Sequence, residues 1–189
     1  MEKDYILASG SPQRRQLLSQ IGYNPKKIQT ANIDESVLKN EEPLPYIRRI
    51  AKAKALNVAK LCPNENILSA DTVIVIGKKI IQKSPDAKTQ EEVLRLLSGH
   101  THRVITSVCL IDKTGKCHQR TVTTKIVMKH LTDKEIEEYI SSNEWVGVAG
   151  YKIEGMLAGY VKKIIGSYSG VIGLPLYETK NLLNGIGIY

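Results

Sequence analysis

The chain has 189 residues, 42% of them hydrophobic, and a formal net charge of +8 at pH 7. No apolar run approaches the ~18 residues that a membrane span needs, and the charged start argues against a secretory signal. Three cysteines without paired spacing are typical of reduced thiols, so we expect a cytoplasmic protein. The positive charge favours an anionic partner, and a nucleotide fits better than a nucleic acid because no aromatic stripe accompanies the scattered basic residues.

The first notable stretch joins a strand end to a helix start. Residues 5–8 form an apolar run, Ser11 stands where an N-cap belongs, and Pro12 takes the first helical position. Arg14 and Arg15 fall in the first turn, where the helix dipole is already positive. A bound phosphate would make these charges favourable. Two arginines that simply point into solvent are the alternative, and the local pattern leaves both open.

A weak strand over residues 28–33 precedes a long helix that opens at Pro43 and runs to about residue 60. Lys54 falls on the apolar stripe of this helix. An ammonium group on a buried face is costly unless it meets an acid or a phosphate. The alternative is a lysine that snorkels to solvent at the edge of the stripe.

The apolar run over residues 67–76 predicts a central strand, which Asp71 interrupts. Aspartate is disfavoured in strands and costly in a core unless it is paired or binds a metal. In the alternative interpretation the strand starts only at Thr72 and Asp71 is an ordinary edge residue. A hairpin turn at residues 77–79 then returns the chain through residues 80–81.

The second half of the chain predicts an antiparallel strand pair, two capped helices, a glycine-rich segment and a final helix. His100 and His102 can share one face of an extended segment, but without a third ligand nearby we expect no transition-metal site there. The predicted elements are strands over 103–112 and 120–128, capping boxes Thr89/Glu92 and Thr132/Glu135, short strands and tight turns over 147–173, and a helix over 177–183.

Strands, hairpins and interspersed helices predict an α/β fold with a mixed sheet and, in the absence of repeats or linkers, a single domain over residues 1–189. Several charged residues are misplaced for a purely structural role. They suit phosphoryl transfer, in which carboxylates serve a divalent cation and a water while cations bind phosphates. No P-loop pattern is present. These residues are Arg14, Arg15, Glu35, Lys54 and Asp71.

Five collinear motifs resemble the Maf (septum formation) family, and together they span nearly the whole chain. The resemblance implies the Maf or inosine-triphosphatase-like fold, an elongated mixed β-sheet flanked by helices, with two lobes around a deep central cleft. The motifs are Leu-Ala-Ser-Gly-Ser-Pro-Gln-Arg-Arg at 7–15, Ala-Lys-Ala-Lys-Ala at 51–55, Ala-Asp-Thr at 70–72, Leu-Ser-Gly-His at 97–100, and Gly-Ser-Tyr-Ser with Val-Ile-Gly-Leu-Pro-Leu at 166–176.

The resemblance also implies a nucleoside triphosphate pyrophosphatase that uses Mg²⁺ or Mn²⁺ and cleaves between the α and β phosphates. It implies a cytoplasmic enzyme, often a homodimer, with a nucleotide substrate and no membrane or stable nucleic-acid partner. By position in the motifs, Asp71 resembles the general base, and Glu35 the acid that holds the metal together with Asp71. The residues that resemble the phosphate ligands are Ser9, Arg14, Arg15, Lys54 and Lys83, with Ser84 between Lys83 and the proline that usually follows it.

The positions that read the base depart from the family. Members that prefer dTTP and UTP usually carry Arg at position 13 and Gln at position 154, whereas members acting on 7-methyl-GTP carry Trp and an acid. This chain has Gln13 and Glu154 and retains Thr72, so it fits neither set. A carboxylate only accepts hydrogen bonds, so Glu154 predicts a base edge that presents N–H groups, as on guanine or a modified base.

The leading hypothesis is a pyrophosphatase that removes unwanted or modified nucleotides from the pool and is linked to cell-division arrest. One alternative is a nucleotide- or nucleic-acid-binding regulator of septum formation, in which catalysis is incidental. Another is a phosphatase that releases inorganic phosphate. The combination of Asp71, Glu35 and Lys54 is unnecessary for binding alone and favours an enzyme.

Overall fold

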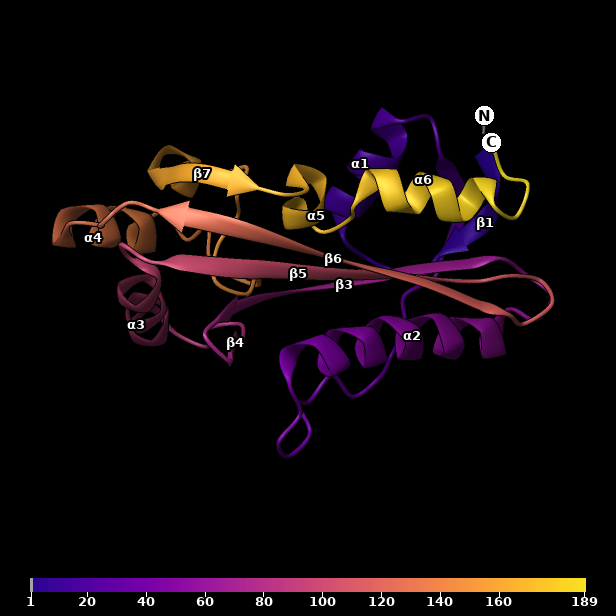
Figure 1. The fold of residues 1–189 in the computed structure, drawn as a ribbon, viewed down its shortest axis with the longest axis horizontal. Helices are drawn as coiled ribbons and strands as arrows, with labels where there is room; N and C mark the ends of the chain where they lie inside the picture. Colours follow the sequence, from indigo (N-terminus) through magenta and orange to yellow (C-terminus); the bar gives the residue numbers. More distant parts are fainter. Residues whose placement is uncertain (1) are drawn as a thin grey trace.

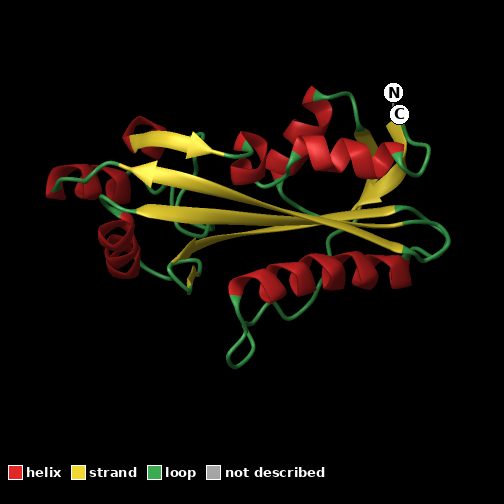
Figure 2. Ribbon diagram, in the orientation of Figure 1, coloured by secondary structure: helices red, strands yellow, loops and turns green. Residues whose placement is uncertain are grey.

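The computed structural model describes residues 2–189 and shows a long β-sheet with helices on both faces (Figure 1, Figure 2). Three long strands run through most of the length of the molecule and form its centre. The seven strands formed by the described residues are β1 (Glu2–Leu7), β2 (Asn24–Ile28), β3 (Ile67–Ile76), β4 (Lys79–Ile81), β5 (Thr101–Ile111), β6 (Cys117–Met128) and β7 (Val161–Ile165).

The sheet is mixed, as the sequence predicts. Its strand order is β2-β1-β3-β5-β6-β7, and β4 pairs with β3 outside this path. β1 runs parallel to both β2 and β3, whereas the other neighbouring pairs are antiparallel. The expected α/β class with an elongated mixed sheet is therefore confirmed.

Helices cover the two faces of the sheet and one of its ends. The longest helix, α2, lies along one face, α1, α5 and α6 lie on the other, and α3 and α4 gather at the end farthest from the chain termini (Figure 1). The helices are α1 (Pro12–Gln20), α2 (Pro43–Leu61), α3 (Ala87–Leu97), α4 (Asp133–Ser141), α5 (Tyr168–Ile172) and α6 (Leu176–Asn184), with a 3₁₀ turn η1 (Met156–Tyr160) before β7.

One edge of β3 is open in its middle. β5 pairs with β3 from Ile67 to Val75, but on the other side β1 reaches only Ile67 and Leu68, and β4 pairs only from Ile74 onward. Residues 69–73 therefore have a strand partner on one side alone. Because successive side chains alternate between the faces of a sheet, Asp71 and Thr72 lie on opposite faces of the sheet at this gap.

The strand prediction around Asp71 is confirmed, since β3 is continuous through this residue, which pairs with Ser107 of β5. The alternative start at Thr72 is wrong. The strand predicted over residues 28–33 is also wrong, because β2 ends at Ile28 and no regular structure follows until α2. The reason lies in the pairing: Ile28 lies opposite Leu7, the last residue of β1, so the ladder has no partner beyond it.

Two further predictions about local structure need correction. The capping box at Thr89 and Glu92 is wrong, since α3 begins earlier and the Asp86 carboxylate caps it by accepting the Thr89 N–H at 2.7 Å. The capping box of Thr132 and Glu135 is confirmed. The glycine-rich segment over 147–173 forms turns, η1 and α5, and β7 is its single described strand.

Within residues 2–189, no helix combines the length and the apolar character that crossing a membrane requires.

Candidate active site

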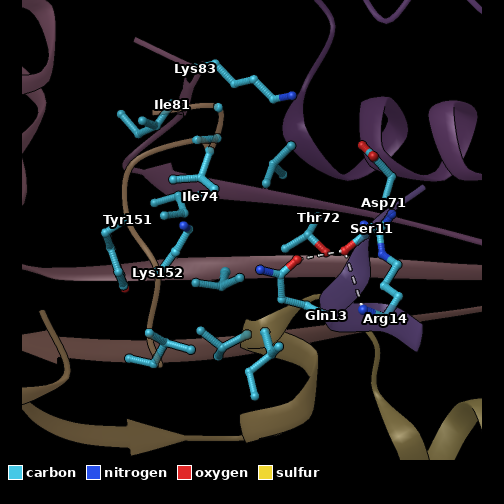
Figure 3. A pocket seen from close by; sticks show the side chains of 18 of the residues that line it. Ser11, Gln13, Arg14, Asp71, Thr72, Ile74, Ile81, Lys83, Tyr151 and Lys152 are labelled. Carbon is cyan, nitrogen blue, oxygen red and sulfur yellow. Dashed lines mark hydrogen bonds between the residues drawn. The ribbon is translucent and has the colours of Figure 1, made fainter. Parts of the chain in front are cut away.

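A cavity of about 690 Å³ lies at the open edge of β3. Its walls come from the start of α1, the segment before α2, α2 itself, the end of β4, residues 147–154 and α5 (Figure 3). Of the site residues predicted from the sequence, Arg15 alone does not line the cavity, and its side chain is exposed. Those that line it are Ser9, Gln13, Arg14, Glu35, Lys54, Asp71, Thr72, Lys83 and Glu154.

Lys54 joins two carboxylates at one end of the cavity. Its ammonium nitrogen lies 2.7 Å from Asp71 Oδ1 and 2.8 Å from Glu35 Oε2. Asp71 is 8% exposed, so its charge requires this partner, whereas the Glu35 side chain is 50% exposed. The lysine on the apolar stripe of α2 therefore meets acids, and the snorkelling alternative is wrong.

Tyr46 of α2 holds the segment that carries Glu35. Its hydroxyl donates a hydrogen bond of 2.9 Å to the backbone carbonyl of Glu35. Burial raises the pKa of Tyr46 to about 12, and the negative charges of Asp71 and Glu35 act in the same direction. The phenol therefore stays neutral and remains a donor at physiological pH, which fixes a segment that has no regular secondary structure.

Arg14 is fixed across the gap between the start of α1 and the end of α5. Its Nε donates to the Gly173 carbonyl at 2.9 Å, and one terminal nitrogen donates to Ser9 Oγ at 3.0 Å. Ser11 caps α1 by accepting the Arg14 backbone N–H, which confirms the predicted helix start. Burial lowers the pKa of the Arg14 guanidinium, while the charges of Asp71 and Glu35 oppose that shift.

Arg14 forms no ion pair within residues 2–189, although it lies in a cavity with two carboxylates. An arginine stays charged even when it is partly buried. Together with the free N–H groups at the start of α1, this guanidinium can receive phosphate oxygens.

The opposite end of the cavity is mainly apolar. Ile74, Ile81 and Val104 line it from the sheet, and Val171 and Ile172 line it from α5. Four polar side chains stand among them, from the start of α1, from β3 and from the loop before η1. These are Gln13, Thr72, Lys152 and Glu154.

Residues 147–154 form the wall at this end, and buried side chains anchor them. Gln90 donates a hydrogen bond of 2.6 Å to the Gly150 carbonyl, and the Tyr151 hydroxyl lies 2.6 Å from His102 Nε2. An isolated bridge also joins Ala149 to Lys83, so the same contact places Lys83 over the cavity (Figure 3).

Sequence reasoning missed Tyr46, Tyr151 and Lys152 as cavity residues. Tyr46 lies on the apolar stripe of α2, where its pattern resembles an ordinary core residue. Tyr151 and Lys152 lie in the glycine-rich segment that was predicted only as strands and turns. The one sequence signal for a place in the cavity is a lysine next to a tyrosine in a glycine-rich segment.

His102 leads to a prediction about stability. It is 1% exposed, its Nδ1 has no hydrogen-bond partner within the described part of the chain, and burial lowers its pKa from 6.5 to about 4. The unfolded chain therefore binds the proton more readily between these values, so stability falls as the pH drops through this window. We expect a loss of about 2 kcal/mol between pH 7 and pH 5, measured by urea unfolding.

His102→Gln removes the titrating group, so its stability should change less over this pH range, even if it is lower throughout. His100→Gln is the matched control because His100 is exposed, and it should retain the pH dependence of the unchanged chain. Equal slopes for the two variants would contradict the assignment to His102.

The cavity residues fit a divalent cation that arrives with a phosphate ligand. Within residues 2–189 there is no group of three or more acidic, histidine or cysteine side chains that could hold a metal alone. Asp71 and Glu35 nevertheless converge on a single ammonium group. One or two carboxylates plus substrate phosphates are the usual ligands of Mg²⁺ in nucleotide enzymes.

Comparison with known proteins gives the family. The profile of the family described as Maf-like protein matches residues 4–186. The chain is 47% identical over 183 residues to a dTTP/UTP pyrophosphatase of Paramagnetospirillum magneticum, covering 96% of both proteins. It is 44% identical over 190 residues to a nucleoside triphosphate pyrophosphatase of Neorickettsia sennetsu, covering 100% of this chain and 91% of that protein.

Among solved structures, a nucleoside-triphosphatase, dITP/XTP pyrophosphatase, of Mycobacterium abscessus aligns over 99% of this chain and 95% of its own, with a TM-score of 0.48 and 13% identity. The match of residues 4–186 to the family profile confirms the resemblance found in the five motifs. The chain belongs to the Maf family.

Proposed function

We propose that this protein is a nucleoside triphosphate pyrophosphatase that hydrolyses the bond between the α and β phosphates, releasing a nucleoside monophosphate and pyrophosphate. The observation that carries the proposal is the Lys54 bridge between Asp71 and Glu35. It lies in the same cavity as Arg14, which has no ion-pair partner among the described residues. A site that only binds a nucleotide gains nothing from these two carboxylates, because they repel the phosphates.

In this proposal Asp71 is the general base. It accepts a proton from a water whose oxygen attacks the α-phosphorus, and the bond from that phosphorus to the bridging oxygen breaks as pyrophosphate leaves. Lys54 orients the carboxylate and holds it close to Glu35. A carboxylate held in this way positions the attacking water at the phosphorus, and this positioning itself lowers the barrier.

In this proposal the triphosphate is bound by cationic groups that lie across the cavity from Asp71 and Glu35. Arg14, Ser9 and the N-terminus of α1 face the cavity together, and Lys83 extends over it from the end of β4 (Figure 3). Their charges offset the negative charge of the phosphates and of the carboxylates. Lys83 is a phosphate ligand in this proposal. Of the two arginines, Arg14 is the one that binds phosphate, because Arg15 is exposed.

The proposal includes Mg²⁺ or Mn²⁺, held by Asp71 and Glu35 together with phosphate oxygens. When bound, the cation neutralises the phosphates and stabilises the charge that develops during cleavage. The apolar end of the cavity takes the base, with Gln13, Thr72 and Glu154 beside it. The cellular role we propose is removal of unwanted or modified nucleotides, with cell-division arrest as a consequence.

Product analysis tests the reaction. A panel of nucleoside triphosphates, including methylated bases, is incubated with Mg²⁺ or Mn²⁺, and the products are separated by anion exchange and identified by ³¹P NMR. We expect equal amounts of monophosphate and pyrophosphate. Release of inorganic phosphate with a diphosphate product would instead support the phosphatase alternative and contradict cleavage between the α and β phosphates.

A further inference from the structure

Gln90 is a fully buried polar side chain on the apolar stripe of α3. It is 0% exposed and shares this stripe with Leu94 and Leu97. A buried amide is costly unless its oxygen and its nitrogen both find hydrogen-bond partners, whereas an apolar residue packs at such a position without that requirement. The proposed reaction assigns no role to Gln90. The reason for a glutamine at this position lies in the groups that it contacts.

Both ends of the Gln90 amide are paired, each with a different segment of the chain. Its Oε1 accepts a hydrogen bond from Ser84 Oγ at 2.8 Å, and its Nε2 donates to the Gly150 carbonyl at 2.6 Å. The orientation of the amide follows from chemistry, because the Gly150 carbonyl can only accept and must face the nitrogen. Neither leucine nor an ionised carboxylate can make this pair of contacts. Gln90 therefore joins the segment before α3 to the wall of the cavity.

Lys83 lies between these two contacts. It directly precedes Ser84, and its backbone forms the isolated bridge with Ala149. The residues on both sides of it belong to no helix or strand, and in the described part of the chain its side chain has no ion pair or hydrogen bond. Figure 3 shows this side chain extending over the cavity. The place of the ammonium group therefore depends on a backbone that Gln90 fixes on both sides.

Gln90 itself connects two points of the fold that are firmly held. The Asp86 carboxylate caps the start of α3, one turn before Gln90. Gly150 has a φ of +74°, and a Cβ added to it would lie 2.7 Å from Ile74 Cδ1 of β3. Gly150 thus packs against the sheet with no room for a side chain. The amide spans these two points, and it holds Ser84 in place against them.

We propose that Gln90 is a positioning residue for phosphate binding, which holds the backbone on both sides of Lys83 and so places the ammonium group for the triphosphate. This inference rests on the proposed function, in which Lys83 is a phosphate ligand. Gln90 does not line the cavity, so its effect on the phosphates passes through Lys83. A long side chain loses rotamer freedom when it binds a ligand, and a backbone that is already fixed keeps the total entropy cost low.

The test measures binding of inorganic tripolyphosphate, which carries phosphates but no base, by calorimetry. No divalent cation is added, so the probe is not cleaved. Ser84→Ala removes one hydrogen bond of the Gln90 amide and should weaken binding by about 3- to 10-fold. Ser84→Thr keeps the hydroxyl and should bind within about twofold of the unchanged protein. Gln90→Leu removes both contacts and should weaken binding by about 10-fold or more.

Ser98→Ala is the matched control. Ser98 lies at the other end of α3, where its hydroxyl accepts the Leu131 backbone N–H at 2.7 Å, and it does not line the cavity. This variant also loses a serine hydrogen bond, so its melting temperature should fall, but its affinity for tripolyphosphate should not change. An equal loss of affinity in Ser98→Ala would show that general loosening of α3 is the cause and would overturn the proposal.

A double-mutant cycle with Lys83→Met separates positioning from a general effect on the fold. Loss of a charge-assisted contact should make Lys83→Met bind tripolyphosphate about 10- to 100-fold more weakly. Because Gln90 acts through Lys83 in this proposal, adding Ser84→Ala to Lys83→Met should weaken binding no further. A further loss equal to that of Ser84→Ala alone would overturn the inference, and so would unchanged affinity of Lys83→Met.

The cycle needs no turnover, so its outcome is independent of the reaction. If the two substitutions are coupled but product analysis finds no cleavage, the proposed function fails and the role of Gln90 in phosphate binding stands. If nucleotides are cleaved between the α and β phosphates but the two substitutions act independently, the inference about Gln90 fails alone.

Discussion

Asp71→Asn is expected to lower kcat by about 10²- to 10⁴-fold, the range that a positioned general base contributes. Asparagine has nearly the same shape as aspartate but cannot accept the proton of the attacking water. Lys54 keeps its contact with Glu35 in this variant, so the cavity should retain its form. Binding of an α,β-imido nucleotide, measured by calorimetry, should therefore stay within about fivefold of the unchanged protein.

Asp133→Asn is the matched control, because it makes the same chemical change at an exposed residue whose partner is Arg95 of α3. It should leave kcat unchanged. If Asp71→Asn also turned over at the normal rate, Asp71 would not be the general base. If it lost nucleotide binding together with activity, its main role would lie in holding the cavity together.

Arg14→Gln is expected to raise KM by about 10- to 100-fold, the effect of losing a charge-assisted hydrogen bond to a phosphate. The half-buried position of Arg14 and its contacts with Gly173 and Ser9 direct its charge into the cavity. Steady-state kinetics with a single nucleotide measures this effect, and a thermal melt checks that the variant folds, since glutamine also loses the contact with Gly173.

Arg15→Gln is the control for this prediction. Both arginines match the phosphate-binding motif of the family, but Arg15 is exposed and does not line the cavity. We expect its KM to stay within about fivefold of normal. Equal effects of the two substitutions would mean that both arginines bind the triphosphate, as the resemblance alone implies.

Local signals made part of the fold and site predictable. Ser11 and Pro12 mark the start of α1 through their own backbone chemistry, and the carboxylate of Asp71 in an apolar strand signals a special environment. Lys54 was recognisable for a similar reason, because a cation on a buried helix face needs a partner. The structure supplies that partner as two carboxylates.

Features that depend on distant pairing were not predictable in this way. The open edge of β3 exists because β1 pairs with β3 only as far as Leu68 and β4 pairs with it only from Ile74 onward. The sequence of β3 alone determines neither limit. The same applies to the contact between Arg14 and Gly173, which are 159 positions apart. The true extent of β2 likewise follows from the end of β1.

Some expectations based on the family resemblance concern properties beyond a single chain. A homodimer and a cytoplasmic location stay predictions, and so does the link to septum formation. The hypothesis of a septum-formation regulator requires nucleotide binding but not the carboxylates of Asp71 and Glu35. It therefore predicts that the protein works without these carboxylates, whereas the proposed function requires them.

The central claim is that a water beside Asp71 attacks the α-phosphorus. Hydrolysis of UTP in H₂¹⁸O, followed by mass spectrometry of both products, tests this claim most directly. The account predicts one ¹⁸O atom in the uridine monophosphate and none in the pyrophosphate, and Asp71→Asn should remove nearly all of this labelled product. Label found in the pyrophosphate instead would show attack on the β-phosphorus and contradict the account.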